Sequence, residues 1–233
     1  MPATPSGGGA GDAVPTPGRA ALLDPTGRLG RLHVLVDSLW LAEAALEGGA
    51  PTVQVRAKSG TDRDRLRLAG AVVERCRAAG ATCLVNDRAD LAIAAGADGV
   101  HVGGDDLPVA TVRAIVGPDA IVGGTARTPE DGRILAGEGA SYLGVGPTYA
   151  TTSKDGLPQP LGPPGVAAVA EAVAVPVIAI AGITAARVAE VLAAGAWGVA
   201  VISAVADASD PHTATHDLLM AVTRAVEALE STS

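Results

Sequence analysis

Short hydrophobic runs rich in β-branched residues recur along the chain from Leu32 onward. Apolar runs of roughly 4 to 8 residues, bounded by glycine, proline or small polar residues, are typical of buried β-strands. The pattern predicts eight strands: Leu32–Val36, Thr52–Arg56, Thr82–Asn86, Gly99–Val102, Ala120–Gly123, Ser141–Val145, Val177–Ile180 and Gly198–Ile202.

Segments rich in Ala and Leu separate these runs, and several begin with Pro after a residue that can cap a helix, as in Thr128-Pro129 and Asp210-Pro211. The predicted helices are Leu41–Glu47, Asp62–Ala79, Ala89–Ala95, Pro108–Val116, Pro129–Glu138, Pro163–Ala172, Ala185–Ala194 and Pro211–Leu229. Strict alternation of strands with helices predicts a parallel sheet closed as a single (β/α)₈ TIM barrel, an α/β fold.

A Gly-Ala pair recurs between a predicted helix and the next predicted strand, at Gly49, Gly80, Gly96, Gly139 and Gly195. We expect each glycine to adopt the left-handed conformation just past its helix. The chain then reaches the carboxyl end of the next strand seven residues further on. TIM barrels build their active sites at that rim, so the repeat collects the candidate chemistry on one face.

Residues 1–28 are rich in Gly, Pro, Ala and Thr and carry no periodicity, so we expect a disordered leader before a barrel domain at 29–233. The net charge of −8 argues against a nucleic-acid partner or a polybasic membrane reader. No apolar stretch is long enough to cross a bilayer, and the first residues do not have the pattern of a signal peptide. The cytoplasm is the expected location, and a homo-oligomer is left open.

Two carboxylates, Asp87 and Asp106, follow adjacent strands at this rim. They suit Mg²⁺, which takes one or two carboxylates and completes its coordination with water and phosphate oxygens. Side chains that suit the oxygens of a phosphate or diphosphate follow other strands: Arg56, Lys58, Thr151, Ser153 and Lys154. Glycines after the last two strands offer backbone N–H groups to a second phosphate. The sequence therefore predicts two small phosphorylated substrates and a magnesium cofactor.

Several rim segments are recognisable, in order: V-Q-V-R-A-K, N-D-R-A-D-L-A, G-A-D-G-V-H-V-G-G-D-D-L-P, G-V-G-P-T-Y-A-T-T-S-K and P-V-I-A-I-A-G-I. Together they resemble the thiamine-phosphate synthase family from about Leu32 to Val205. The resemblance implies a transferase that joins hydroxymethylpyrimidine diphosphate to a thiazole phosphate and releases pyrophosphate with the assistance of Mg²⁺.

The resemblance also implies roles for individual residues. The pyrimidine diphosphate would be bound by Gln54, Arg56, Lys58, Asn86 and Lys154, and the magnesium by Asp87 and Asp106. Thr125 stands where the family usually has Ser, Thr151 and Ser153 would contact the thiazole substrate, and Gly182, Ile202 and Ser203 would surround its phosphate. Lys154, Arg56 and Lys58 are the expected catalytic residues, because negative charge grows on the departing diphosphate.

Three positions depart from the family pattern. Gly104 stands where Gln is common, Ala57 replaces a usual Glu, and Ala181 replaces the first Gly of an I-G-G-I turn. A methyl group at Ala181 could crowd a phosphate that approaches the backbone there. We therefore expect this departure to act on the thiazole-phosphate site.

Two other functions stay open at this point. A thiazole tautomerase-like barrel would need an acid–base residue at the rim, but Arg127 lies where a catalytic His could sit after the fifth strand. A non-catalytic phosphate-sensing barrel would bind its ligand without magnesium. Among the remaining residues, His101 is expected to be a packed barrel residue, His212 and His216 to lie on a solvated helix face, and Cys76 and Cys83 to be small core residues.

Overall fold

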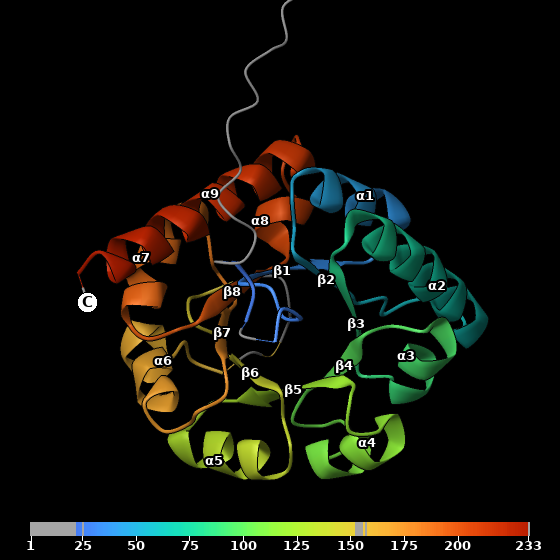
Figure 1. Cartoon of the computed structure of the whole chain (residues 1–233), viewed down its shortest axis with the longest axis horizontal. Helices are drawn as coiled ribbons and strands as arrows, with labels where there is room; N and C mark the ends of the chain where they lie inside the picture. The colour runs from blue at the N-terminus through green and yellow to red at the C-terminus, as the bar shows by residue number, and fades with distance from the viewer. Residues whose placement is uncertain (1–21, 25, 152–155, 157, 233) are drawn as a thin grey trace, which may run out of the picture.

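The computed structural model describes residues 22–24, 26–151, 156 and 158–232. Its strands are all parallel, and each pairs with the next one along the chain until the last pairs with the first, which confirms the predicted TIM barrel (Figure 1). The strands are β1 (Leu32–Val36), β2 (Thr52–Val55), β3 (Thr82–Asn86), β4 (Gly99–Val102), β5 (Ile121–Ala126), β6 (Tyr142–Val145), β7 (Val177–Ile180) and β8 (Gly198–Val201).

Helices form a ring around the barrel (Figure 1). They are α1 (Leu39–Glu47), α2 (Asp62–Ala79), α3 (Ala89–Ala95), α4 (Val109–Val116), α5 (Pro129–Gly137), α6 (Gly162–Ala170), α7 (Ala185–Ala193), α8 (Ser203–Ala206) and α9 (Pro211–Glu230). The short helix α8 was not predicted. The long helix α9 packs against both α7 and α1 and so closes the outer ring.

The alternation of side chains along each strand divides the core into two layers. In β1, Leu32, Val34 and Val36 belong to the large apolar layer between the sheet and the helices. Leu35 belongs instead to a smaller cluster on the barrel axis, which includes Leu84 of β3 and Tyr142 of β6. The chain has no Phe, and its core consists mainly of Val, Leu, Ile and Ala around one central tyrosine.

The five repeated glycines that precede strands all have positive φ angles, as the sequence predicts: Gly49, Gly80, Gly96, Gly139 and Gly195. Strand β5 differs from its prediction, because it continues through Gly123 to Ala126. A Cβ at Gly123 would lie 2.3 Å from Cζ of Tyr142 and 2.4 Å from Nδ1 of His101. Glycine at this position therefore makes room inside the barrel and does not end the strand.

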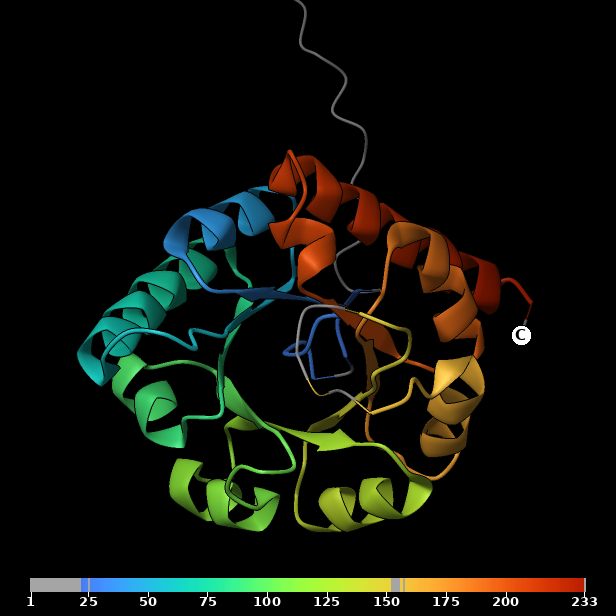
Figure 2. The same ribbon diagram turned by 180° about the vertical axis from the view of Figure 1, so that it is seen from behind.

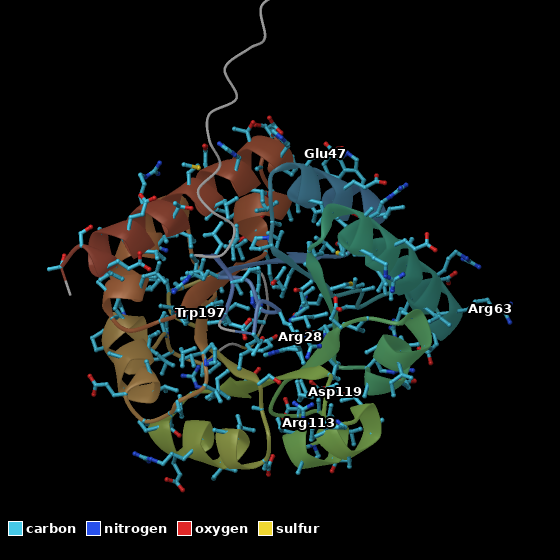
Figure 3. All side chains as sticks on the ribbon, in the orientation of Figure 1. Arg28, Glu47, Arg63, Arg113, Asp119 and Trp197 are labelled. Atoms are coloured by element: carbon cyan, nitrogen blue, oxygen red, sulfur yellow. The ribbon has the colours of Figure 1, made fainter. Side chains whose placement is uncertain are left out.

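The barrel domain begins earlier than the boundary predicted at residue 29. Leu22 is buried in the main core, and Leu23 forms an antiparallel bridge with Gly30. The side chain of Arg28 donates to the carbonyl of Asp119 across the amino-terminal end of the barrel, the face seen in Figure 3. Residues 1–21 of the leader predicted at 1–28 lie outside the described residues, whereas Leu22 and Leu23 contact the barrel.

None of the helices within the described residues combines the length and the apolar character that crossing a membrane would require.

Candidate active site

A cavity of about 400 Å³ opens at the carboxyl end of the barrel, the end that faces the viewer in Figure 2. Its lining includes each predicted site residue that lies within the described chain: Gln54, Arg56, Lys58, Asn86, Asp87, Asp106, Thr125, Thr151, Gly182, Ile202 and Ser203. Ser153 and Lys154 lie outside the described residues. The sequence predicts that these residues lie at one rim, and the structure brings them together around one cavity.

The two predicted metal-binding carboxylates lie side by side. Asp87 follows β3 with a φ of 65°, a left-handed conformation that Asp tolerates better than most residues, and its N–H donates to the carbonyl of His101 at 2.7 Å. Asp106 accepts a hydrogen bond from the N–H of Gly103 at 2.7 Å. Partial burial, together with the neighbouring Asp87 carboxyl, raises the pKa of the Asp106 carboxyl.

Two adjacent carboxylates that repel one another fit a divalent cation, because the cation removes the repulsion. The described residues contain no cluster of three or more His, Cys, Asp or Glu side chains that could hold a metal. Asp87 and Asp106 would therefore leave most coordination positions to water or substrate oxygens. That arrangement suits Mg²⁺, which usually keeps several waters and binds substrate phosphates.

Positive charge lines the cavity on both sides of this pair. The ammonium group of Lys58 forms an ion pair with Asp87. Arg56 lies at the end of β2, where its N–H is fixed by a 2.7 Å hydrogen bond to the carbonyl of Val36 in β1. Arg127 follows β5 and also lines the cavity. Anionic oxygens could therefore meet positive charge from two strand ends, those of β2 and β5, although the chain as a whole is acidic.

A buried polar network below these charges was missed by sequence reasoning. His101 was expected to be only a packed residue, but it lines the cavity and its ring nitrogens lie 3.0 Å from the Tyr142 hydroxyl and 3.0 Å from Oγ1 of Thr125. Gln54 donates to the same Tyr142 hydroxyl at 3.5 Å. The available signal was strand alternation on β4: His101 lies between two valines, Val100 and Val102, that pack in the outer apolar layer, so its own side chain points inward.

Burial keeps the rings of this network neutral. Burial lowers the pKa of His101 to about 4 and raises the pKa of the Tyr142 phenol. His33 lies deeper, with its ring 5.2 Å from that of Tyr142, and burial lowers its pKa to about 3. The network can therefore orient a polar ring through neutral hydrogen bonds, but it adds no charge to the cavity.

The opposite side of the cavity is built from the ends of β7 and β8. Ala181 and Gly182 have φ angles of 76° and 67°. A Cβ at Gly182 would lie 2.7 Å from Cβ of Tyr149, so only glycine fits there. Ala181 keeps the backbone path that the family's glycine would follow, at a strain cost of about 1–2 kcal/mol. Ile202 and Ser203 line this side at the start of α8.

The remaining sequence predictions concern residues away from the cavity. His212 and His216 lie exposed on α9, and Cys76 and Cys83 are buried free cysteines, as predicted. None of these residues contributes to the cavity lining within the described chain.

Comparison with known proteins agrees with the sequence motifs. Residues 33–205 match the family model for thiamine monophosphate synthase. A thiamine-phosphate synthase of Salinispora arenicola is 51% identical over 204 residues, which cover 84% of this chain and 98% of that protein. The corresponding protein of Salinibacter ruber is 46% identical over 195 residues, which cover 80% of this chain and 86% of that protein.

Solved structures point the same way. The thiamine phosphate pyrophosphorylase of Pyrococcus furiosus superposes with a TM-score of 0.78 at 32% sequence identity, covering 89% of this chain and 98% of that one. A 3-hexulose-6-phosphate synthase with a TM-score of 0.61 at 22% identity shares the fold alone. With matches that span the whole barrel, the chain belongs to the thiamine-phosphate synthase family of transferases.

Proposed function

We propose that this protein joins hydroxymethylpyrimidine diphosphate to a thiazole phosphate, giving thiamine phosphate and pyrophosphate with Mg²⁺. The observation that carries the proposal is the pair Asp87 and Asp106 beside Lys58, at the mouth of a cavity whose floor is neutral and polar. A charged mouth suits a magnesium diphosphate. A neutral floor with donors and acceptors suits an aminopyrimidine ring.

The diphosphate half of the site comes from the ends of β2, β3 and β4 and the segment after β6. Asp87 and Asp106 would hold the magnesium, which would neutralise charge on the diphosphate when bound. Arg56, Lys58 and Asn86 bind the diphosphate oxygens together with Lys154, and Gln54 orients the pyrimidine. Because negative charge grows on the departing group, the cations that touch it stabilise the transition state more than the bound substrate.

Bond breaking precedes attack by the thiazole nitrogen in this proposal. The C–O bond to the diphosphate breaks with both electrons leaving on oxygen, and the aminopyrimidine delocalises the cation that remains. The thiazole nitrogen then donates its lone pair to that carbon. Both ring nitrogens of His101 are held in hydrogen bonds with the hydroxyls of Tyr142 and Thr125, so neither is free to attack the cation, and the half-buried mouth limits access of water to it.

The second substrate occupies the side formed by β7 and β8. Thr151 and Ser153 contact the thiazole, Thr125 lies between the two halves, and Gly182, Ile202 and Ser203 surround the phosphate. Ala181 supports this assignment, because its left-handed backbone follows the path expected of the family's glycine. The cytoplasmic location and a homo-oligomeric state stay predictions.

One observation weighs against the tautomerase alternative. The residue after β5 is Arg127, whose guanidinium donates to two backbone carbonyls, at 2.9 Å and 3.0 Å. A guanidinium stays protonated in proteins and cannot accept a proton as a general base. Proton transfer at this position therefore has no evident residue to perform it.

A calorimetric titration tests the proposal against the phosphate-sensing alternative. The pyrimidine diphosphate should bind much more tightly with Mg²⁺ than with EDTA, and product should form only when both substrates are present. Binding of equal strength with and without magnesium, and no condensation, would favour a phosphate-sensing barrel.

A further inference from the structure

The segment between β6 and α6 leaves the barrel beside the point to which it returns. On its outgoing side, the carbonyls of Pro147 and Thr148 accept hydrogen bonds from Leu161 at 2.8 Å and Gly162 at 3.0 Å on the returning side. We call residues 146–151 the outgoing stem and residues 158–161 the returning stem. Thr151, which lines the cavity, is the last residue of the outgoing stem.

One side chain from outside this segment joins the two stems. Nη1 of Arg127 donates to the carbonyl of Gly146 at 2.9 Å, and Nη2 donates to the carbonyl of Gln159 at 3.0 Å. The planar fork of a guanidinium can reach two acceptors at once, which the single ammonium of lysine does less well. Arg127 therefore bridges the outgoing stem at its first residue and the returning stem before it meets α6.

The position of Arg127 is itself fixed by the start of α5. Its backbone N–H donates to Oδ2 of Asp131 at 3.1 Å, and the same oxygen accepts from the N–H of Thr128 at 3.0 Å in the capping box of α5. The Asp131 carboxylate thus fixes the backbone of Arg127 and also forms part of the cap of α5. No ion pair neutralises the Arg127 side chain within the described residues.

We propose that Arg127 is a positioning residue for the reaction, which holds both stems so that the outgoing stem presents Thr151 to the cavity. The proposal rests on the proposed function for its kinetic consequence, but the geometry of the stems does not depend on it. Without the guanidinium, the backbone pairs to Leu161 and Gly162 remain, while Gly146 and Gln159 lose their common donor. The stems should then move more, and Thr151 should reach the substrates less often.

The test compares Arg127→Met, which keeps the aliphatic chain, and Arg127→Lys with the matched control Arg133→Met. Arg133 lies on α5, is exposed, and pairs only with Glu130. For Arg127→Met we expect turnover to fall about 10- to 100-fold, the range that small misplacements of a substrate cause. Turnover of Arg127→Lys should be intermediate, and turnover of Arg133→Met should be unchanged.

Amide exchange at Leu161 and Gly162 should become faster in Arg127→Met. Binding of magnesium pyrophosphate, the probe for the diphosphate site, should change less than about twofold, because β2 and β3 supply its main ligands.

Several results would overturn the proposal. Turnover within about twofold of the unchanged protein, or unchanged amide exchange at Leu161 and Gly162, would show that Arg127 does not position the two stems. A loss of pyrophosphate affinity as large as the loss of turnover would make Arg127 a direct anion ligand. If Arg127→Met does not fold, Arg127→Lys decides through the same exchange and binding measurements. Absence of product with the unchanged protein would contradict the proposed function instead, and the exchange measurement would still test Arg127.

Discussion

Lys58 and Asp87 form an ion pair across the ends of two neighbouring strands, β2 and β3. In the proposed reaction these residues have different partners, the diphosphate for Lys58 and the magnesium for Asp87. The ion pair therefore holds both side chains at the mouth of the cavity before substrate arrives. When a magnesium diphosphate binds, contacts of each side chain with the ligand replace the ion pair. Binding of metal and diphosphate should accordingly be coupled, each strengthening the other.

Asp106→Ala should remove most activity and leave the fold intact. Asp106 accepts a hydrogen bond from the N–H of Gly103 at the rim and lies outside the apolar core, so the barrel does not depend on it for packing. We expect turnover to fall by about 100-fold or more, in line with the loss of other groups that stabilise transition-state charge.

Asp105→Ala, at the neighbouring exposed residue, is the control, and its turnover should keep the magnesium dependence of the unchanged protein. Retained activity in Asp106→Ala at an unchanged magnesium affinity would disprove the metal assignment.

Lys154→Ala should slow the chemical step more than it weakens substrate binding. The prediction rests on the sequence motif, because Lys154 lies outside the described residues. A cation that acts mainly on the departing diphosphate affects kcat and kcat/KM together, and the expected loss is about 10²–10³-fold. Lys154→Arg should recover part of the rate, since a planar fork replaces a compact charge. Single-turnover measurements decide: an unchanged chemical step with weaker diphosphate binding would make Lys154 an anchoring residue only.

Truncation should locate the true start of the barrel. A disordered leader at residues 1–28 would make removal of residues 1–26 harmless, but this deletion takes away buried Leu22 and also Asp24, whose carboxylate accepts from the N–H groups of Arg28 and Leu29 at 2.8 Å each. We expect removal of 1–21 to leave Tm nearly unchanged. Removal of 1–26 should lower Tm by about 3 to 12 °C, from the burial energy of one leucine in a chain of this length. Equal melting temperatures for the two truncations would contradict the packing of Leu22.

The pH dependence of stability should reflect His33 and His101. Their folded pKa values of about 3 and about 4 lie below the ordinary value of 6.5, so the unfolded chain binds more protons between these limits. The free energy of unfolding should therefore be highest above pH 6.5 and fall as pH decreases toward 4, by at most about 2.7 kcal/mol per pH unit for two protons. Denaturant titrations should show this slope reduced in His33→Gln and unchanged in His212→Gln, at an exposed residue of α9. A flat profile from pH 7 to 4 would show that neither ring is buried in its neutral form.

The barrel could be predicted from sequence because each of its units repeats the same local signals. A left-handed glycine after a helix, a β-branched run and a capped helix start are all short-range features, and Gly80, Thr128 and Asp210 behave as their patterns indicate. The positions of the rim residues could be predicted from the same repeat, because a constant spacing separates each glycine from the carboxyl end of the next strand. Asp87 and Asp106 could be placed on one face without knowledge of any contact between them.

The features that the sequence did not predict depend on contacts between distant segments. From the sequence, Gly123 was predicted to end a strand, whereas in the structure it leaves room for the side chains of Tyr142 and His101. Leu22 looks like part of a polar leader until it meets the core. Arg127 looks like a replaced catalytic residue until its guanidinium meets the carbonyls of the β6–α6 segment. Each of these depends on a partner many residues away.

The most direct measurement is a product analysis by mass spectrometry. The purified protein is mixed with hydroxymethylpyrimidine diphosphate, thiazole phosphate and Mg²⁺, and both expected products are quantified over time. The account predicts thiamine phosphate and pyrophosphate in equal amounts, no product when either substrate or magnesium is withheld, and a rate lowered by about 100-fold or more in Asp106→Ala. Failure to form thiamine phosphate with both substrates and magnesium present, or formation at the same rate in EDTA, would contradict it.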